Sequence, residues 1–164
     1  GVIKKWIFNT EAKKLKAKRI ATGHNLDDEA QTYLMNIFKG SPKLSSNIGP
    51  ISKNLEGTKS GKFIPRIKPL FFVPEESIRE YTKVLEIPVN YDPCPCSFDS
   101  YRIQVRKFLS KMPDDDKRNI VRNFDKVSDK LEKIKDTNLN YCENCGEPCR
   151  GKTCKKCQLL DLKN

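Results

Sequence analysis

Four cysteines near the end of the chain have the spacing of a metal site. They form two C-x-x-C pairs, Cys142/Cys145 and Cys154/Cys157, with eight residues between the pairs. Each pair brings two thiolates to one side of a tight turn, and two pairs close a tetrahedral site around Zn²⁺. Four thiolates leave no open coordination position, so we expect a structural zinc site that supplies folding energy to a small segment. Cys149 is then a spare thiol, and its replacement of one ligand is a variant of the same hypothesis.

The cysteine count agrees with metal binding. The chain has seven cysteines, an odd number, and five of them fall between residues 142 and 157. Such clustering suits metal binding in a reducing compartment better than a disulfide framework. A disulfide pair and a group of free thiols are the alternatives.

A second candidate site lies near the N-terminus, where the pattern over 18–22 predicts a short buried strand. The segment Gly23-His24-Asn25-Leu26-Asp27-Asp28-Glu29 follows it and opens a helix. In α/β folds, ligands bind at this position, between the carboxyl end of a strand and the N-terminus of a helix. Gly23 would let the backbone approach a nucleotide, and the carboxylates could orient Mg²⁺ or a reacting group.

The same segment also has a purely structural interpretation. Asn25 is a good N-cap, and Asp28 stands three residues later, in a capping-box position. Three acids in a first helical turn are favoured by the helix dipole. His24, the one histidine of the chain, could equally be a structural residue.

Alternating helices and strands are needed to position these sites, and the pattern predicts them. An α/β layer structure follows from this alternation. We predict helices over 1–17, 25–40, 74–87, 98–111 and 113–136, strands over 18–22, 63–67 and 89–91, a mobile loop over 41–61, and a domain boundary at the polar break 138–140.

Apolar residues at helical spacing predict which helix faces are buried. The residues expected to be buried are Ile78, Tyr81 and Leu85 in the third helix, Tyr101, Val105 and Phe108 in the fourth, and Ile120, Phe124, Val127, Leu131 and Ile134 in the fifth.

Composition indicates an anionic partner. The chain has 164 residues, of which 37% are apolar, enough for one core. Lys and Arg total 32 against 21 Asp and Glu, a net charge of +11, which favours a partner such as nucleic acid. Candidate phosphate contacts are Arg66, Lys68, Arg102, Arg106 and Lys107, and a solvated basic face is the alternative for each.

The sequence also bears on location and completeness. No apolar run is long enough for a membrane span, and the N-terminus lacks the pattern of a signal peptide, so we expect a soluble, cytoplasmic protein without membrane contact. The chain starts at Gly1 without an initiator Met, from which we expect a fragment or a tagged form.

Several segments together resemble one known family. The segment Gly23-His24-Asn25-Leu26-Asp27-Asp28-Glu29-Ala30-Gln31-Thr32 resembles the second nucleotide-site motif of the PP-loop ATPases that thiolate tRNA, the TtcA/TtuA family. Three later segments resemble further blocks of that family in the expected order: Pro65-Arg66-Ile67-Lys68-Pro69-Leu70 with Pro74-Glu75-Glu76, Cys94-Pro95-Cys96-Ser97, and the zinc ribbon Cys154-Lys155-Lys156-Cys157-Gln158-Leu159-Leu160. The ribbon is similar to that of TtuA and of the archaeal and eukaryotic wobble-uridine thiolases.

The resemblance implies a fold and a division into domains. The fold is the C-terminal part of a Rossmann-like PP-loop domain of the adenine nucleotide alpha hydrolase type, over 1–137, followed by a zinc ribbon over 138–164. Gly1-Val2-Ile3-Lys4-Lys5 resembles the segment that follows a C-x-x-C pair in the family, and the family's phosphate-binding S-G-G-x-D-S loop is not in the chain. We therefore expect a part of the enzyme that is inactive alone.

The resemblance also implies a reaction. ATP, with Mg²⁺, adenylates the C2 oxygen of a tRNA uridine, most readily the wobble uridine, and sulfur supplied through a 4Fe-4S cluster then replaces AMP. By residue, Gly23, His24 and Asp27 match the ATP motif, and Lys4 and Asp28 match positions near the reacting centre. Cys94 matches the third cluster ligand, with Cys96 as the alternative.

The family further implies a homodimer and a sulfur donor that is either a ubiquitin-like sulfur carrier or inorganic sulfide. Two other hypotheses compete with thiolation. One is a non-catalytic zinc-ribbon adaptor that binds RNA, and the other is a PP-loop enzyme without a cluster.

Overall fold

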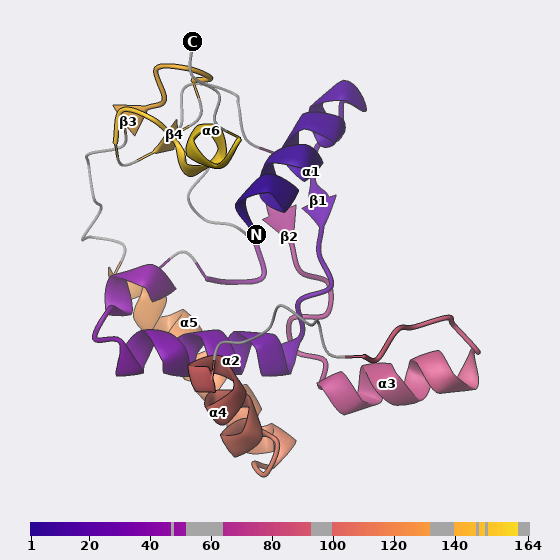
Figure 1. Ribbon diagram of the computed structural model, residues 1–164. Coiled ribbons are helices and arrows are strands. Elements are labelled where there is room, and N and C mark those ends of the chain that lie inside the picture. The colour runs from indigo at the N-terminus through magenta and orange to yellow at the C-terminus, as the bar shows by residue number, and fades with distance from the viewer. Residues whose placement is uncertain are drawn as a thin grey trace.

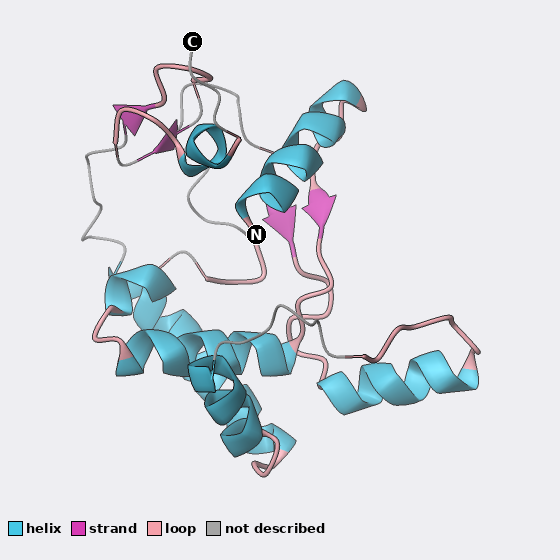
Figure 2. Cartoon of the chain, viewed as in Figure 1, coloured by secondary structure: helices cyan, strands magenta, loops and turns pink. Residues whose placement is uncertain are grey.

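The computed structural model describes residues 1–46, 48–51, 64–92, 100–131, 140–146, 148–149 and 151–160. Helices dominate the described residues, and the strands are short (Figures 1 and 2). In chain order, the elements are α1 (Val2–Lys14), β1 (Ile20–Ala21), α2 (Leu26–Phe38), the 3-10 helix η1 (Pro42–Ser45), β2 (Arg66–Ile67), α3 (Glu75–Val84), α4 (Ser100–Leu109), α5 (Asp114–Leu131), β3 (Asn140–Tyr141), β4 (Pro148–Cys149) and α6 (Lys155–Leu159).

The hydrophobic core lies where α2 packs against both α4 and α5 (Figure 1). The rings of Tyr33 on α2 and Phe124 on α5 are stacked, with 4.5 Å between their centres. Aromatic stacking of this kind adds to the stabilisation that burial provides. The buried members of the core are Leu26, Ala30, Tyr33, Ile48, Phe71, Val105, Leu109 and Val121.

A parallel pair of strands lies beside this helical layer. β1 pairs with β2 so that Ile20 lies opposite Arg66 and Ala21 opposite Ile67, and α1 packs against β1. Parallel strands separated by a helix make this an α/β fold, as predicted. The prediction of a buried strand over 18–22 is wrong in one respect, because Ile20 is half-buried and Ala21 is exposed. A two-residue ladder covers too little surface to bury its own side chains.

Helix α3 projects away from the core (Figure 1), which corrects the predicted buried stripe. Ile78 is half-buried, whereas Tyr81 and Leu85 are 62% and 52% exposed. The apolar spacing correctly predicts a helix. It cannot say whether another element covers the apolar face, and none of the described elements does.

The strand predicted over 89–91 is also wrong. The Asn90 side chain accepts the backbone N–H of Asp92 at 2.8 Å, which makes a local turn. The Tyr91 hydroxyl is hydrogen-bonded to Thr82 Oγ1 of α3, also at 2.8 Å. The segment therefore folds back on α3 and joins no sheet.

The predicted buried faces of α4 and α5 are correct in part, because Val105 is buried and Tyr101, Ile120 and Phe124 pack against the core. On α4, Val105 and Leu109 are buried and Phe108 is 58% exposed. On α5, Val121 is fully buried, while Val127 is exposed. A helix face includes positions three and four apart, and neighbouring apolar residues leave the choice of face open. Parts of several predicted elements lie outside the described residues: 47 and 52–61 of the loop, 63 of the second strand, 98–99 of the fourth helix, 132–136 of the fifth helix, and 138–139 of the domain boundary.

The cysteine-rich end, over the described residues 140–146, 148–149 and 151–160, forms a small unit that we call the cysteine unit. β3 and β4 are antiparallel, with Asn140 opposite Cys149 and Tyr141 opposite Pro148. The one-turn helix α6 follows and packs against α1 (Figure 1). Among the described helices, none combines the length and the apolar character needed to cross a membrane.

Candidate metal centre and candidate nucleotide site

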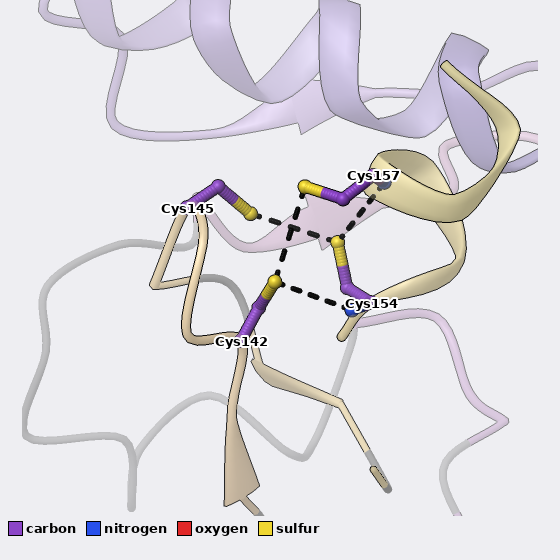
Figure 3. Close-up of side chains that lie close together, drawn as sticks. All are labelled: Cys142, Cys145, Cys154 and Cys157. Carbon is purple, nitrogen blue, oxygen red and sulfur yellow. Dashed lines mark hydrogen bonds between the residues drawn. The ribbon is translucent and has the colours of Figure 1, made fainter. Parts of the chain in front are cut away.

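The four paired cysteines meet at one point, as the sequence predicts. The sulfurs of Cys142, Cys145, Cys154 and Cys157 all lie within 4.8 Å of one another (Figure 3). The Cys145 and Cys154 sulfurs are 3.6 Å apart, and those of Cys142 and Cys157 are 3.9 Å apart. Zinc–sulfur bonds of about 2.3 Å in a tetrahedron place the sulfurs about 3.8 Å from each other. The spacing therefore fits a tetrahedral thiolate site, and it is too long for disulfides, whose sulfurs are about 2.0 Å apart.

Backbone N–H groups shape the sulfur cluster. The Cys154 N–H donates to Cys142 Sγ at 3.2 Å, and the Cys157 N–H donates to Cys154 Sγ at 3.5 Å. Gly146, which has a φ of +66°, closes the first turn through its N–H to the Cys142 carbonyl at 2.8 Å. These are the tight turns that two C-x-x-C pairs require.

The thiol pKa values follow from these contacts. The Cys154 N–H is the main cause that lowers the pKa of Cys142 to about 6. Burial is the main cause that raises the pKa of Cys157 to about 12. The Cys142 thiolate is thus stabilised, whereas the Cys157 thiolate lacks a compensating positive charge, which a metal ion would supply. A closed set of four sulfurs suits a structural ion rather than a catalytic one.

Cys149 does not join the four sulfurs. Its thiol donates to the Gly151 carbonyl at 2.8 Å. This arrangement agrees with a spare thiol. The two other predicted metal ligands, Cys94 and Cys96, lie outside the described residues.

The predicted nucleotide motif starts at the carboxyl end of β1. The Thr22 N–H donates to the Ile67 carbonyl at 3.0 Å, which continues the strand pairing, and His24 Nδ1 is 3.0 Å from Thr22 Oγ1. Gly23 and His24 are both exposed. A Cβ built on Gly23 would have no described atom within 4 Å, so the described residues do not themselves require glycine there.

The motif then caps α2 as the structural interpretation predicts. The Asp28 N–H donates to Asn25 Oδ1 at 3.0 Å, and the Asn25 N–H donates to Asp28 Oδ2 at 3.4 Å, which completes a capping box. Capping and ligand binding are compatible here, since Asp28 also lines a pocket. The pocket residues are Asp27, Asp28 and Gln31 of α2, Glu75 of α3, and Arg106, Leu109 and Ser110 on or just after α4.

Asp27 joins three helices, a role that the sequence analysis missed. Its Oδ2 accepts the N–H of Glu75, the first residue of α3, at 2.7 Å. Its Oδ1 accepts from Lys117 Nζ of α5, also at 2.7 Å, and Lys117 bonds to Asp114 Oδ1 at 3.0 Å. Burial alone would lower the pKa of Lys117, but the hydrogen bonds and charges of these two carboxylates outweigh it and raise the pKa. Both Asp27 oxygens are thus engaged within the chain.

Glu29 and Lys68 form a buried ion pair that the sequence analysis also missed. Lys68 Nζ lies 2.7 Å from Glu29 Oε1, and their side chains are 19% and 3% exposed. Burial raises the pKa of Glu29, and the Lys68 hydrogen bond partly offsets this. Glu29 Oε2 is buried with no hydrogen-bond partner among the described residues. Glu29 lies three residues after Leu26 and four before Tyr33 on the buried face of α2, and this spacing is the signal that could have found it.

Three of the other predicted basic residues, Arg66, Arg102 and Arg106, have partners of their own. Arg106 Nη2 is 2.6 Å from both carboxylate oxygens of Glu75. Arg102 Nε donates to Gln31 Oε1 at 3.3 Å, and Arg66 Nη2 donates to the Lys5 carbonyl at 3.4 Å. Lys107 is exposed on α4.

Lys4, predicted near the reacting centre, lies exposed on α1. Its Nζ is 5.6 Å from the centre of the Phe8 ring. Lys4 and Asp28 are both described, and no hydrogen bond or ion pair joins them. The structure therefore brings the four paired cysteines to one point. It also keeps Gly23 to Asp28 together at the start of α2, and no described hydrogen bond or ion pair joins Lys4 to Asp28.

These features define an α/β protein with a ligand motif at the end of a strand and a four-cysteine unit, and comparisons with known proteins identify its relatives. A probable sulfurtransferase of Methanocaldococcus jannaschii is 37% identical over 98% of this chain, which covers 46% of that protein. The tRNA 2-thiolation protein NcsA of Haloferax volcanii is 33% identical over 98% of the chain, which covers 53% of it. The chain thus spans about half the length of these curated relatives.

A solved structure agrees with the sequence matches. The U34-tRNA thiolase NcsA from Methanococcus maripaludis, determined with its 4Fe-4S cluster, superposes with a TM-score of 0.74 at 31% identity, over 100% of this chain and 52% of that one. No family model matches the chain. The chain is homologous to tRNA 2-thiolation proteins, which confirms the resemblance found in its sequence.

Proposed function

We propose that the chain is part of an ATP-dependent enzyme that thiolates C2 of a tRNA uridine, the wobble uridine being the favoured target. The observation that carries this proposal is the match along the whole chain, at 31% identity, to a U34-tRNA thiolase. Relatives described as cytoplasmic tRNA 2-thiolation proteins, such as one from Caenorhabditis elegans at 31% identity, support a cytoplasmic location. The proposed division is a PP-loop part over 1–137 and a zinc ribbon over 138–164.

The proposed reaction has two steps. The uridine C2 oxygen attacks the α-phosphorus of ATP, with Mg²⁺ present, and pyrophosphate leaves as the bond between the α- and β-phosphates breaks. The C2 oxygen, a poor leaving group, is thereby adenylated and becomes part of a good one. Sulfur then forms a bond to C2, and the C2–oxygen bond breaks as AMP leaves. A bound 4Fe-4S cluster would supply the sulfur, with Cys94 as a ligand and Cys96 as the alternative. A sulfur carrier protein or sulfide would replenish it.

Residues of the strand-end motif bind and orient the substrates in this proposal. The open surface at Gly23 allows a nucleotide to approach the backbone, and His24 is exposed beside it. Asp28 lines the pocket and is assigned to the reacting centre, with Lys4 supplying positive charge. Asp27, assigned to the ATP site, acts there by holding α3 and α5 against the start of α2.

The net charge of +11 supports tRNA as the partner, and binding should weaken steeply with salt. The proposed phosphate contacts are Arg66, Lys68, Arg102, Arg106 and Lys107. Lys68 and Arg106 would have to leave Glu29 and Glu75 to contact RNA, whereas Lys107 is exposed. The proposed enzyme is a homodimer.

The test is a thiolation assay on the full-length protein that contains this chain, purified without oxygen and reconstituted with iron and sulfide. Unmodified tRNA, ATP and sulfide are supplied, and 2-thiouridine is measured by nucleoside mass spectrometry. We expect product from the wild type and a loss of at least about 100-fold in Asp28→Asn, because a positioned catalytic group contributes about 10²–10⁴-fold. Asp115→Asn is the matched control, an exposed carboxylate of α5.

Three results would contradict all or part of the proposal. ATP binding by the reconstituted wild type without any 2-thiouridine would exclude thiolation. Unchanged RNA binding and cellular function in Asp28→Asn would instead favour the adaptor hypothesis. Thiolation by protein that contains zinc but no iron would remove the cluster from the mechanism.

A further inference from the structure

A buried lysine joins the four-cysteine unit to α1. Lys156 lies on α6, between Cys154 and Cys157, and is only 8% exposed. Its Nζ lies 4.7 Å from the centre of the Trp6 ring on α1. An ammonium group within about 6 Å of a tryptophan face is attracted by the ring, and burial strengthens the attraction. Figure 1 shows α6 beside α1, and Figure 3 shows α1 passing close to the cysteines.

Burial of this lysine is unusual and needs a physical cause. Lysines are almost never buried without a partner. Among the salt bridges of the described residues, none includes Lys156, so the Trp6 ring is the contact that compensates for its lost hydration. Such a contact works only while α6 holds the ammonium over the ring.

The position of α6 depends in turn on the sulfur cluster. The helix has five residues, too few for stability on its own. Cys154 caps its N-terminus and Cys157 lies at its middle, so the sulfur cluster holds the helix through both residues. The four sulfurs have the spacing of a tetrahedral metal site, as shown above, and no disulfide joins them. A metal ion would therefore supply the free energy that keeps α6 formed and Lys156 over Trp6.

Helix α1 is attached elsewhere as well: it packs against β1, and Arg66 Nη2 donates to the Lys5 carbonyl at 3.4 Å. The Ile64 N–H donates to Asn9 Oδ1 at 3.0 Å, and Asn9 and Ala12 are the buried residues of the helix. Much of the remaining surface is exposed, including Ile7 and Phe8, which are both 44% exposed. The cysteine unit thus contributes a substantial share of what fixes α1.

We propose that metal binding by the cysteine unit positions α1, and that Lys156 transmits this effect through its contact with Trp6. Lys156 is a positioning residue in this account. The proposal concerns the fold alone and does not depend on ATP, tRNA or thiolation. Metal binding and the Lys156–Trp6 contact are coupled, and such coupling is reciprocal. The contact that holds α1 should therefore also raise the affinity of the cysteines for the metal.

Trp6 provides a direct readout, since it is the one tryptophan of the chain. The test uses the zinc-loaded 164-residue chain and records Trp6 emission and its quenching by acrylamide. We expect removal of zinc by a chelator to shift the emission to longer wavelength and to raise the quenching constant about twofold, and one equivalent of zinc to reverse both changes. Far-UV circular dichroism checks that the helices of the core persist.

A variant separates coupling from folding of the cysteine unit. Lys156→Ala should keep one zinc per chain, yet show in its loaded form the emission and quenching of the metal-free wild type. Its zinc affinity, measured by competition with a chelator, should fall about 5- to 30-fold, the range expected for a desolvated cation over a tryptophan ring. Lys155→Ala is the matched control, the exposed neighbour on α6. Lys156→Arg should restore the wild-type emission, because a guanidinium group also binds an aromatic face.

Trp6 emission that is insensitive to zinc, with the core intact, would overturn the proposal. So would equal zinc affinity and emission in Lys156→Ala and Lys155→Ala. Both results are independent of the thiolation assay, so this proposal and the proposed function can fail separately.

Discussion

The ion pair between Glu29 and Lys68 predicts a large and asymmetric response to mutation. Lys68→Met removes the ammonium 2.7 Å from a carboxylate that is 3% exposed, whereas Lys68 itself is 19% exposed. Breaking a buried pair costs about 3–5 kcal/mol when a charge is left behind. Because water reaches Lys68, we expect the lower end, about 3 kcal/mol of unfolding free energy at pH 7. At about 2–4 °C per kcal/mol for a chain of this size, Tm should fall by about 6–12 °C.

The effect should depend on pH in a direction that the pKa fixes. Burial raises the pKa of Glu29 above 4.5, and the Lys68 hydrogen bond holds part of that rise back. The folded chain therefore binds this proton more tightly than the unfolded chain, and stability falls as pH rises from 4.5 through the raised pKa. In Lys68→Met this offset is lost, so the pKa of Glu29 rises further than in the wild type. The deficit therefore grows as pH rises from the wild-type pKa of Glu29 to its higher pKa in the variant. Near pH 4 Glu29 is protonated, and the deficit should nearly vanish.

Urea denaturation of the zinc-loaded chain at pH 7 and pH 4, followed by circular dichroism, measures these quantities. The double variant Glu29→Gln/Lys68→Met leaves no charge behind, so it should be more stable at pH 7 than Lys68→Met alone. Glu29→Gln should cost less than Lys68→Met, since the remaining ammonium can reach water. A Lys68→Met deficit below about 1 kcal/mol, the same at both pH values and not relieved in the double variant, would refute the reasoning.

Three further predictions concern other described contacts. Lys117→Met should cost about 2–3 kcal/mol of unfolding free energy, because Asp27 and Asp114 both lose their cation. The control Arg118→Met breaks one exposed pair with Asp115 and should cost below about 1 kcal/mol by the same measurement. Asn25→Ala should cost about 1 kcal/mol through the lost cap of α2, and an unchanged denaturation midpoint would contradict that. Cys149→Ser should keep one zinc per chain by elemental analysis and Cys154→Ser should lose it; the opposite outcome would reassign the ligands.

Local signals in the sequence predict the sites better than they predict burial. Two C-x-x-C pairs predict the sulfur cluster, because each pair forms its own turn and few geometries remain for four thiols. Asn25 and Asp28 predict the capping box, since capping involves residues three apart. Both features are decided within a few residues along the chain.

Properties that depend on contacts between distant parts of the chain could not be predicted from the sequence. The apolar face of α3 is exposed because no described element covers it. Residues 89–91 form no strand because they fold back on α3. The contact of Lys117 with Asp27 joins positions 90 residues apart, and no local pattern distinguishes Lys117 from the many other lysines of the chain. The chain's amphipathic patterns predicted helices correctly and their partners poorly.

The two neighbouring aspartates of the motif show why the structure changes the interpretation of a sequence pattern. In the sequence alone, Asp27 and Asp28 are equivalent carboxylates in a first helical turn. In the structure, Asp27 accepts from Glu75 N–H and Lys117 at 2.7 Å each, and a ligand that took its oxygens would have to break the attachment of α2 to both α3 and α5. The Asp28 carboxylate accepts one longer bond, from the Asn25 N–H at 3.4 Å, and Asp28 lines the pocket. A ligand therefore reaches Asp28 at lower cost, and Asp27 keeps the pocket in shape around it.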